Sequence, residues 1–269
     1  MFLFDRDTDF KRLEPDAETQ LFTGEISNNW GVNDVPNGGY LMAVVANAMM
    51  QSAEKNATPL ITVNYISRCE PGKADISVET FSSSRQFDRL QAILTQDGQE
   101  KIRAFGTFAI ETDGAEDVRY EKSPPDVLPV DECFQMPPIS DKYSIFSNLD
   151  VRLDPSCAGW MSGQYTDISE HKGWIKFSDD RPLDALSILL LADSFPPPVF
   201  VSQGMVAWVP TLEFSVNVRS VPETKWLKCV FRTRFINNGL LEEDGEVWDE
   251  NDNLIAVSRQ IAQYKKQDD

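Results

Sequence analysis

Apolar and polar residues alternate along two segments of the chain, as they do in strands that cover a core with one face. The first segment surrounds Ile76 and Val78. In residues 212–219 the same period recurs at Leu212, Phe214, Val216 and Val218. A period of two is typical of antiparallel sheets with one buried and one solvated face. The dipeptide Asp244-Gly245 favours a hairpin turn between such strands.

Apolar residues three to four positions apart predict two helices. The first extends from Asn37 to Glu54, and Asn37 can cap its start. The second extends from Arg181 to Phe195, and three prolines follow it and end it. Pro182 suits the first turn of this helix. Because apolar residues nearly encircle the second helix, we expect it to be buried.

The two halves of the chain carry these patterns in the same order. When the segment from Pro59 is laid beside the segment from Pro210, Arg68 falls on Arg219. Each half contains a helical stretch, a strand and three more strands. The sequence therefore predicts an α+β fold made of two copies of one unit, each with a long helix on an antiparallel sheet.

A proline-rich segment separates the two halves. Residues 116–144 contain five prolines among scattered acids. Because proline lacks a backbone donor, we expect a linker without regular strand pairing. The predicted units are then residues 1–115 and 145–269.

Charge and composition narrow the possible functions. The 269 residues include 43 acidic and 25 basic side chains, a net charge of −18. Such a surface repels phosphate backbones, so we expect no nucleic-acid partner. The longest apolar runs, Tyr40 to Ala46 and Ile188 to Ala192, are too short to span a membrane. The start, Met-Phe-Leu-Phe-Asp-Arg-Asp, reaches acids before any apolar stretch develops and is not typical of a signal peptide, so we expect a soluble, cytoplasmic protein.

The cysteines and the histidine favour neither a metal site nor a serine hydrolase. The four cysteines are far apart and read as free core thiols, so we expect no metal or other cofactor. His171, the only histidine, lies in the polar segment DISEHKGW, where we expect a solvated turn. No G-x-S-x-G motif accompanies it. What remains is hydrolysis driven by a carboxylate, with water as the nucleophile.

Asp193 is the most informative residue in the sequence. It ends the apolar helix, where a negative charge opposes the helix dipole. Burying a carboxylate there is costly unless it is hydrogen-bonded. Asp193 either closes the helix toward solvent or serves a functional site.

Two more polar residues of the second half replace apolar residues of the first. Thr211 falls on Leu60, and Gln260 falls on Phe108. Each alone is an ordinary strand residue, but the joint change favours a site in the second half. The pair Gly38-Gly39 at the start of the first helix either offers N–H groups to a carbonyl or anion, or permits close packing.

The chain resembles the acyl-CoA thioesterase II (TesB-like) family, which has a double hotdog fold. The resemblance rests on NGGYLMAVVANAM, RCEPGKADISVETFSSSRQF, LLLADSFPPPVF, PTLEFSVNVR and NLIAVSRQIAQY, in that order. It implies two tandem hotdog repeats, each a long helix wrapped by an antiparallel sheet. It also implies hydrolysis of an acyl-CoA to a free acid and CoA, within lipid metabolism.

The resemblance assigns roles to individual residues. Asp193, Thr211 and Gln260 match the three family residues that bind the attacking water. The N–H of Gly39, beside Gly38, would polarise the thioester carbonyl, and Trp30 and Tyr40 would line an acyl tunnel. The expected partner is the acyl-CoA substrate, and a homo-oligomer is a further possibility because sheet edges of such folds often pair.

Two alternatives stay open. The chain could be a non-catalytic protein that binds acyl-CoA and keeps the fold. It could also be a hotdog enoyl-CoA hydratase or dehydratase, which would use an aspartate and histidine pair and so require His171.

Overall fold

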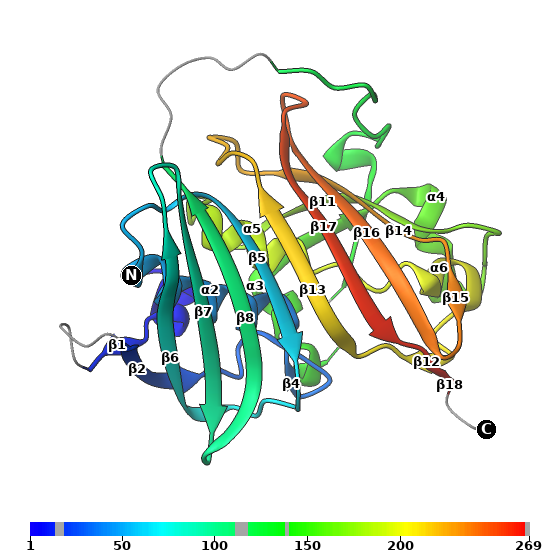
Figure 1. Cartoon of the computed structure of the whole chain (residues 1–269). Helices are drawn as coiled ribbons and strands as arrows, with labels where there is room; N and C mark the ends of the chain where they lie inside the picture. The colour runs from blue at the N-terminus through cyan, green and yellow to red at the C-terminus, as the bar shows by residue number, and fades with distance from the viewer. Residues whose placement is uncertain (14–18, 111–117, 138–139, 267–269) are drawn as a thin grey trace.

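The structure is a computed structural model that describes residues 1–13, 19–110, 118–137 and 140–266. Within these residues, one 14-stranded antiparallel sheet dominates the molecule, and α2 and α5 lie behind it in the view of Figure 1. The first part of this sheet, from its edge inward, consists of β1 (Lys11–Arg12), β2 (Thr19–Ile26), β6 (Gly72–Ser83), β7 (Phe87–Gln96), β8 (Gln99–Ala109) and β5 (Ala57–Tyr65).

The second part of the sheet comes from the C-terminal half of the chain. It continues through β13 (Thr211–Val218), β17 (Leu254–Gln263), β16 (Leu240–Asp249), β14 (Leu227–Thr233), β11 (Ser169–Phe177), β10 (Leu149–Leu153) and β9 (Phe134–Gln135), and β15 (Ile236–Asn237) pairs with β16. Two short pairs lie outside the sheet, β3 (Gly31–Val32) with β4 (Val35–Pro36) and β12 (Ala207–Trp208) with β18 (Lys265–Lys266).

The helices are mostly short. They are α1 (Leu3–Thr8), α2 (Gly38–Ser52), α3 (Ile145–Asn148), α4 (Pro155–Ala158), α5 (Ala185–Leu191) and α6 (Val199–Gln203), with 3-10 turns η1 (Val130–Glu132), η2 (Asp141–Tyr143) and η3 (Gly159–Ser162). No helix of the described residues is long and apolar enough to cross a membrane.

β5 and β13 join the two halves of the sheet. They pair antiparallel, with Ile61 opposite Val216 and Val63 opposite Phe214. The predicted repeat lays these two segments beside each other, and in the structure they are neighbouring strands. The strand predicted around Ile76 and Val78 is also confirmed, since β6 buries both side chains.

The first predicted helix is confirmed and the second is shorter than predicted. Asn37 caps α2, and its side chain accepts a hydrogen bond from the Tyr40 N–H. α5 begins only after Asp184, because Asp184 and Ser187 form a reciprocal capping box there. Pro182 therefore precedes the helix rather than lying in its first turn. Ala192 ends α5, so Asp193 follows the helix.

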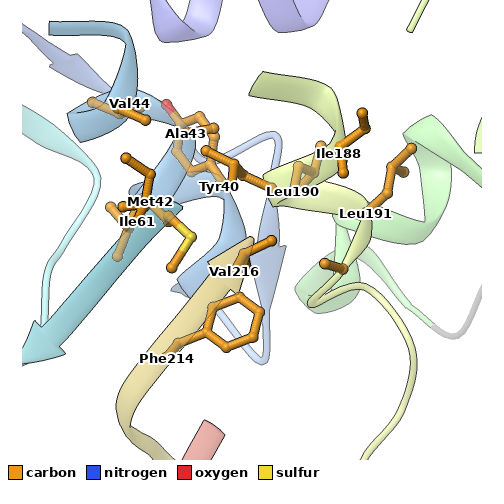
Figure 2. Packing of buried hydrophobic residues seen from close by; sticks show 14 of the residues in the cluster. Tyr40, Met42, Ala43, Val44, Ile61, Ile188, Leu190, Leu191, Phe214 and Val216 are labelled. Carbon is orange, nitrogen blue, oxygen red and sulfur yellow. The ribbon is translucent and has the colours of Figure 1, made fainter. Parts of the chain in front are cut away.

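The helices α2 and α5 pack against each other over the junction of the sheet. Figure 2 shows this core, in which Tyr40 of α2, Ile61 of β5, Leu190 of α5 and Phe214 of β13 are at most 1% exposed. α2 also lies against β6, β7 and β8. The long helix of the first half thus holds the short helix of the second half at a fixed place.

The predicted linker is more regular than expected. Phe134 and Gln135 form β9, which pairs with β10 at the sheet edge, and this corrects the expectation of no pairing. The stretch from Val130 to Met136 contains no proline, so its N–H groups are available for a strand. Residues 116, 117, 138 and 139 of the predicted linker lie outside the described residues.

Candidate active site

Asp193 lies between the end of α5 and the start of α2. Its Oδ2 accepts hydrogen bonds from the Gly39 N–H at 2.7 Å and from Asn37 Nδ2 at 3.0 Å. Asn37 Nδ2 also donates to the Asp193 backbone oxygen at 2.9 Å. A negative charge is disfavoured at the C-terminus of α5 but favoured at the N-terminus of α2. The first half of the chain therefore stabilises the carboxylate that the second half supplies.

The glycine pair allows this approach. A Cβ on Gly39 would lie 2.7 Å from Asp193 Cβ and 2.8 Å from the Leu189 backbone oxygen. A Cβ on Gly38 would lie 3.0 Å from Asp193 Oδ2. The sequence left two interpretations of this glycine pair, close packing or N–H groups that bind a carbonyl or anion. Both describe part of the site, since the glycines permit close helix packing and one N–H binds an anion. The anion is the protein's own carboxylate.

The carboxyl group of Asp193 is poised to exchange a proton near neutral pH. Burial raises its pKa to about 6, although the hydrogen bonds from Gly39 and Asn37 act to lower it. A group with this pKa is mostly ionised at neutral pH and can still accept a proton, as a general base must. Among the described residues both hydrogen bonds to the carboxylate fall on Oδ2, which leaves Oδ1 able to accept a proton.

A β-bulge turns Thr211 toward Gln260. Thr211 pairs with Ala262 of β17 and Phe214 pairs with Gln260, and the register shifts between Thr211 and Glu213. Thr211 and Phe214 would face opposite sides of a regular strand, and the bulge brings them to one side. Thr211 Oγ1 donates a hydrogen bond to Gln260 Oε1 at 2.6 Å. Leu212, predicted to face the core, is instead 36% exposed because of this bulge.

Glu243 is a polar residue of this cluster that sequence reasoning missed. It lies on β16 directly opposite Gln260 and is buried, and the Gln260 side chain acts to lower its pKa. Burial, and then the negative charge of Asp193, raise its pKa to about 8. Glu243 is therefore mostly protonated at neutral pH. In sequence it lies in the acidic run LLEEDGE, which is typical of a surface, and only the strand register identifies it.

Tyr65 is a second residue near Asp193 that sequence reasoning missed. Its hydroxyl donates a hydrogen bond to the Gly38 backbone oxygen at 2.7 Å. Burial and the charge of Asp193 raise the pKa of Tyr65 well above its ordinary value. The phenol therefore stays neutral and contributes no charge beside the carboxylate.

An apolar cavity of about 610 Å³ lies beside Asp193. Among the described residues that line it, Asp193 is the only charged one. The lining is rich in aromatic side chains from the second half and the predicted linker, namely Tyr143, Phe146, Trp160, Tyr165, Phe195 and Phe200. The arrangement resembles an apolar ligand pocket with one charged group at a defined point.

The structure places Trp30 and Tyr40 away from this lining. Both are buried in the core, where their rings stack at a centroid distance of 6.2 Å. Trp30 Nε1 donates to Asp7 Oδ2, and the Tyr40 hydroxyl donates to the Asp7 backbone oxygen. Of the four residues expected to bind substrate, Gly38 and Gly39 meet Asp193, whereas Trp30 and Tyr40 pack around α1 and α2.

His171 does not lie in a solvated turn, which corrects the expectation from sequence. It belongs to β11 and is fully buried beside Trp160. Neither ring nitrogen has a hydrogen-bond partner among the described residues, and burial lowers its pKa to about 3. Among all the residues that the structure describes, no group of three His, Cys, Asp or Glu side chains could hold a metal ion.

Solved structures of similar shape define the class of fold. A candidate thioesterase II from Thermobifida fusca is 24% identical, with a TM-score of 0.89 over 99% of this chain and 98% of that one. A conserved hot dog fold protein from Alicyclobacillus acidocaldarius is 22% identical, with a TM-score of 0.86 over the full length of both chains. Acyl-CoA thioesterase II TesB2 from Mycobacterium marinum is 14% identical, with a TM-score of 0.75 over 98% of each chain. These likenesses show a hotdog fold.

The family follows from the sequence itself. Residues 26–109 match the family model of the acyl-CoA thioesterase N-terminal domain, and residues 124–264 match that of the acyl-CoA thioesterase C-terminal domain. Together these matches cover most of the chain. The protein belongs to the acyl-CoA thioesterase family.

Proposed function

We propose that this protein hydrolyses acyl-CoA thioesters to a free acid and CoA, with a water activated by Asp193, Thr211 and Gln260. The observation that carries the proposal is the position of Asp193. A carboxylate with a pKa of about 6 is the charged residue at the wall of an apolar cavity of about 610 Å³. When the carbonyl of a thioester lies beside Asp193, its acyl chain can extend into this cavity, away from water. Membership of the thioesterase family supports the same reaction class.

The hydrogen-bond directions support one way of activating the water. Thr211 donates its hydroxyl hydrogen to Gln260, so its oxygen is an acceptor. In the proposed reaction the water donates one hydrogen to Thr211 Oγ1 and the other to Asp193 Oδ1, and a water lone pair attacks the carbonyl carbon. Asp193 takes a proton as the C–O bond forms. The C–S bond then breaks, and Asp193 returns that proton to the sulfur of CoA.

The amides at the start of α2 supply the second part of the proposed reaction. Gly39 donates its N–H to Asp193 and thereby orients the base. Asn37 takes the N–H of Tyr40. The N–H of Gly38, the first of the helix, is then the one proposed to polarise the carbonyl and to stabilise the negative charge that develops on its oxygen.

The architecture proposed for this reaction is a duplicated one. Residues 1–115 and 145–269 form two hotdog units joined by residues 116–144. The pairing of β5 with β13 supports this division, because these strands hold equivalent places in the two halves. The first unit contributes the start of α2, and the second contributes the three residues that hold the water.

A panel of acyl-CoA esters of increasing chain length tests the function. Release of CoA by the wild type, lost in Asp193→Asn, supports the proposal. Asp180→Asn is the matched control, because the Asp180 carboxylate is exposed and pairs with Lys225 on the surface. Binding of acyl-CoA without hydrolysis of any ester would indicate the non-catalytic alternative. Hydration of enoyl-CoA that His171→Leu abolishes would indicate the hydratase alternative.

A further inference from the structure

Glu243 takes no part in the reaction proposed above, yet it is buried against the residues that do. The amide of Gln260 lies between two partners. Thr211 Oγ1 donates to Oε1 at 2.6 Å, and the buried Glu243 side chain lies directly opposite Gln260 on the neighbouring strand β16. With Oε1 accepting from Thr211, the NH2 group of the amide needs an acceptor of its own, and the carboxyl group of the cross-strand neighbour Glu243 can supply one and fix the rotation of the amide plane.

We infer that Glu243 is a positioning residue that fixes the Gln260 amide and thereby keeps Thr211 an acceptor for the attacking water. This inference rests on the proposed thioesterase reaction. Without Glu243, the amide of Gln260 can rotate and present its NH2 group to Thr211. The Thr211 hydroxyl then donates elsewhere, and the attacking water loses one of its two acceptors.

The charge of Glu243 matters as well as its shape. The groups that act on it are Asp193, which follows α5, and Glu242 and Asp244 of its own strand, and all three are negative. The basic residues of the two flanking strands are engaged elsewhere. Arg259 of β17 pairs with Asp244, whereas Arg232 of β14 pairs with Glu170 and Glu246, and Lys228 of β14 pairs with Asp252.

Among the described residues, no cation therefore acts on Glu243, and burial raises its pKa to about 8. Ionised Glu243 would place a second negative charge beside Asp193 and the developing oxyanion. The rate should consequently fall as Glu243 ionises above that pH.

Two substitutions separate these effects. Glu243→Gln keeps an oxygen that can accept from Gln260 but cannot ionise. Glu243→Leu introduces an apolar side chain of similar size, which can neither accept a hydrogen bond nor ionise. Glu246→Gln is the matched control, because Glu246 lies on the same strand but on its other face. Circular dichroism confirms that each variant is folded before kinetics are measured.

We expect kcat of Glu243→Leu to fall roughly ten- to a hundredfold with little change in KM, as for a small misplacement of a catalytic group. Glu243→Gln should stay within about threefold of the wild type at neutral pH and should lose the alkaline fall in kcat/KM. The Glu246→Gln control should keep both the wild-type rate and the alkaline fall.

Three results would overturn the inference. Unchanged kinetics in Glu243→Leu would exclude a positioning role, and an alkaline fall that persists in Glu243→Gln would assign that fall to another group. In both cases hydrolysis by the wild type, lost in Asp193→Asn, would leave the proposed function standing. If the wild type hydrolyses no thioester, the proposed function is wrong, and this inference is wrong as well.

Discussion

Thr211 and Gln260 share a 2.6 Å hydrogen bond because β13 carries one extra residue against β17 between Thr211 and Glu213. In a regular strand Thr211 would face away from Phe214, which pairs with Gln260. The bulge thus decides which side chain of the strand meets the amide. It exposes Leu212 and turns a hydroxyl inward.

The hydroxyl of Thr211 should be essential, whereas its methyl group should not. Thr211→Val has nearly the same shape but cannot donate to Gln260 or accept from water. We expect its kcat to fall roughly a hundredfold, the loss typical of one preorganised polar contact in an active site. Thr211→Ser keeps the hydroxyl and should retain most activity. Equal activity in the two variants, measured as CoA release, would exclude a role for the hydroxyl.

The rate should depend on the ionisation of Asp193. Only the ionised carboxylate can accept a proton from water, so kcat/KM should fall as the pH drops below about 6. Asn37→Ser removes one hydrogen bond to Oδ2 that lowers this pKa, while serine can still cap α2. The acid side of the profile should therefore move to higher pH in this variant. A profile that does not move would show that Asn37 does not act on the base.

The sequence predicted individual helices and strands better than the contacts between strands that form the site. The start of α2 and the burial of β6 follow from local periods and a capping residue, which are properties of neighbouring residues. The inward turn of Thr211 and the place of Glu243 depend on register between strands distant in sequence. The alternation of apolar and polar residues along β13 predicts that Leu212 faces the core, because this alternation does not reveal a bulge.

The other differences have the same physical origin. His171 is flanked by polar residues in sequence, and its burial is decided by Trp160 and the strands on either side of β11. α5 is shorter than its apolar pattern because the Asp184 side chain caps it late. Asp193, by contrast, could be singled out from sequence, since a carboxylate directly after an apolar helix opposes the helix dipole.

The two glycines at the start of α2 should differ in how well they tolerate a methyl group. At Gly39 the added Cβ would meet the backbone oxygens of Leu189 and Leu190 at 2.8 and 2.9 Å. At Gly38 it would meet the side-chain atoms of Asp193 and Tyr65 at 3.0 Å, which can move aside more easily.

Gly39→Ala should therefore lower the free energy of unfolding by about 1–3 kcal/mol, as overpacking does. Gly38→Ala should lower it less, because the side chains of Asp193 and Tyr65 can move aside whereas the backbone oxygens beside Gly39 cannot. Urea unfolding measures both values. A Gly39→Ala variant as stable as the wild type would mean that α5 can retreat from α2 without penalty. The same variant should lose activity, since Asp193 moves with α5.

Buried His171 should make the protein sensitive to acid. Its pKa is lowered to about 3 in the folded state, so the folded protein does not bind a proton there between that pH and about 6.5. The unfolded chain does bind one, so stability is fully present above about pH 6.5 and is lost as the pH falls. Each pH unit in this window costs about 1.4 kcal/mol.

His171→Leu removes this sensitivity and breaks no hydrogen bond of the described residues, because neither ring nitrogen has a partner among them. From pH 6.5 to 5 the wild type should lose about 2 kcal/mol more of its free energy of unfolding than the variant does. Since His171 is the only histidine, no other imidazole can account for the difference. Urea unfolding at the two pH values measures it, and parallel losses in both proteins would mean that His171 is hydrated or protonated in the folded state.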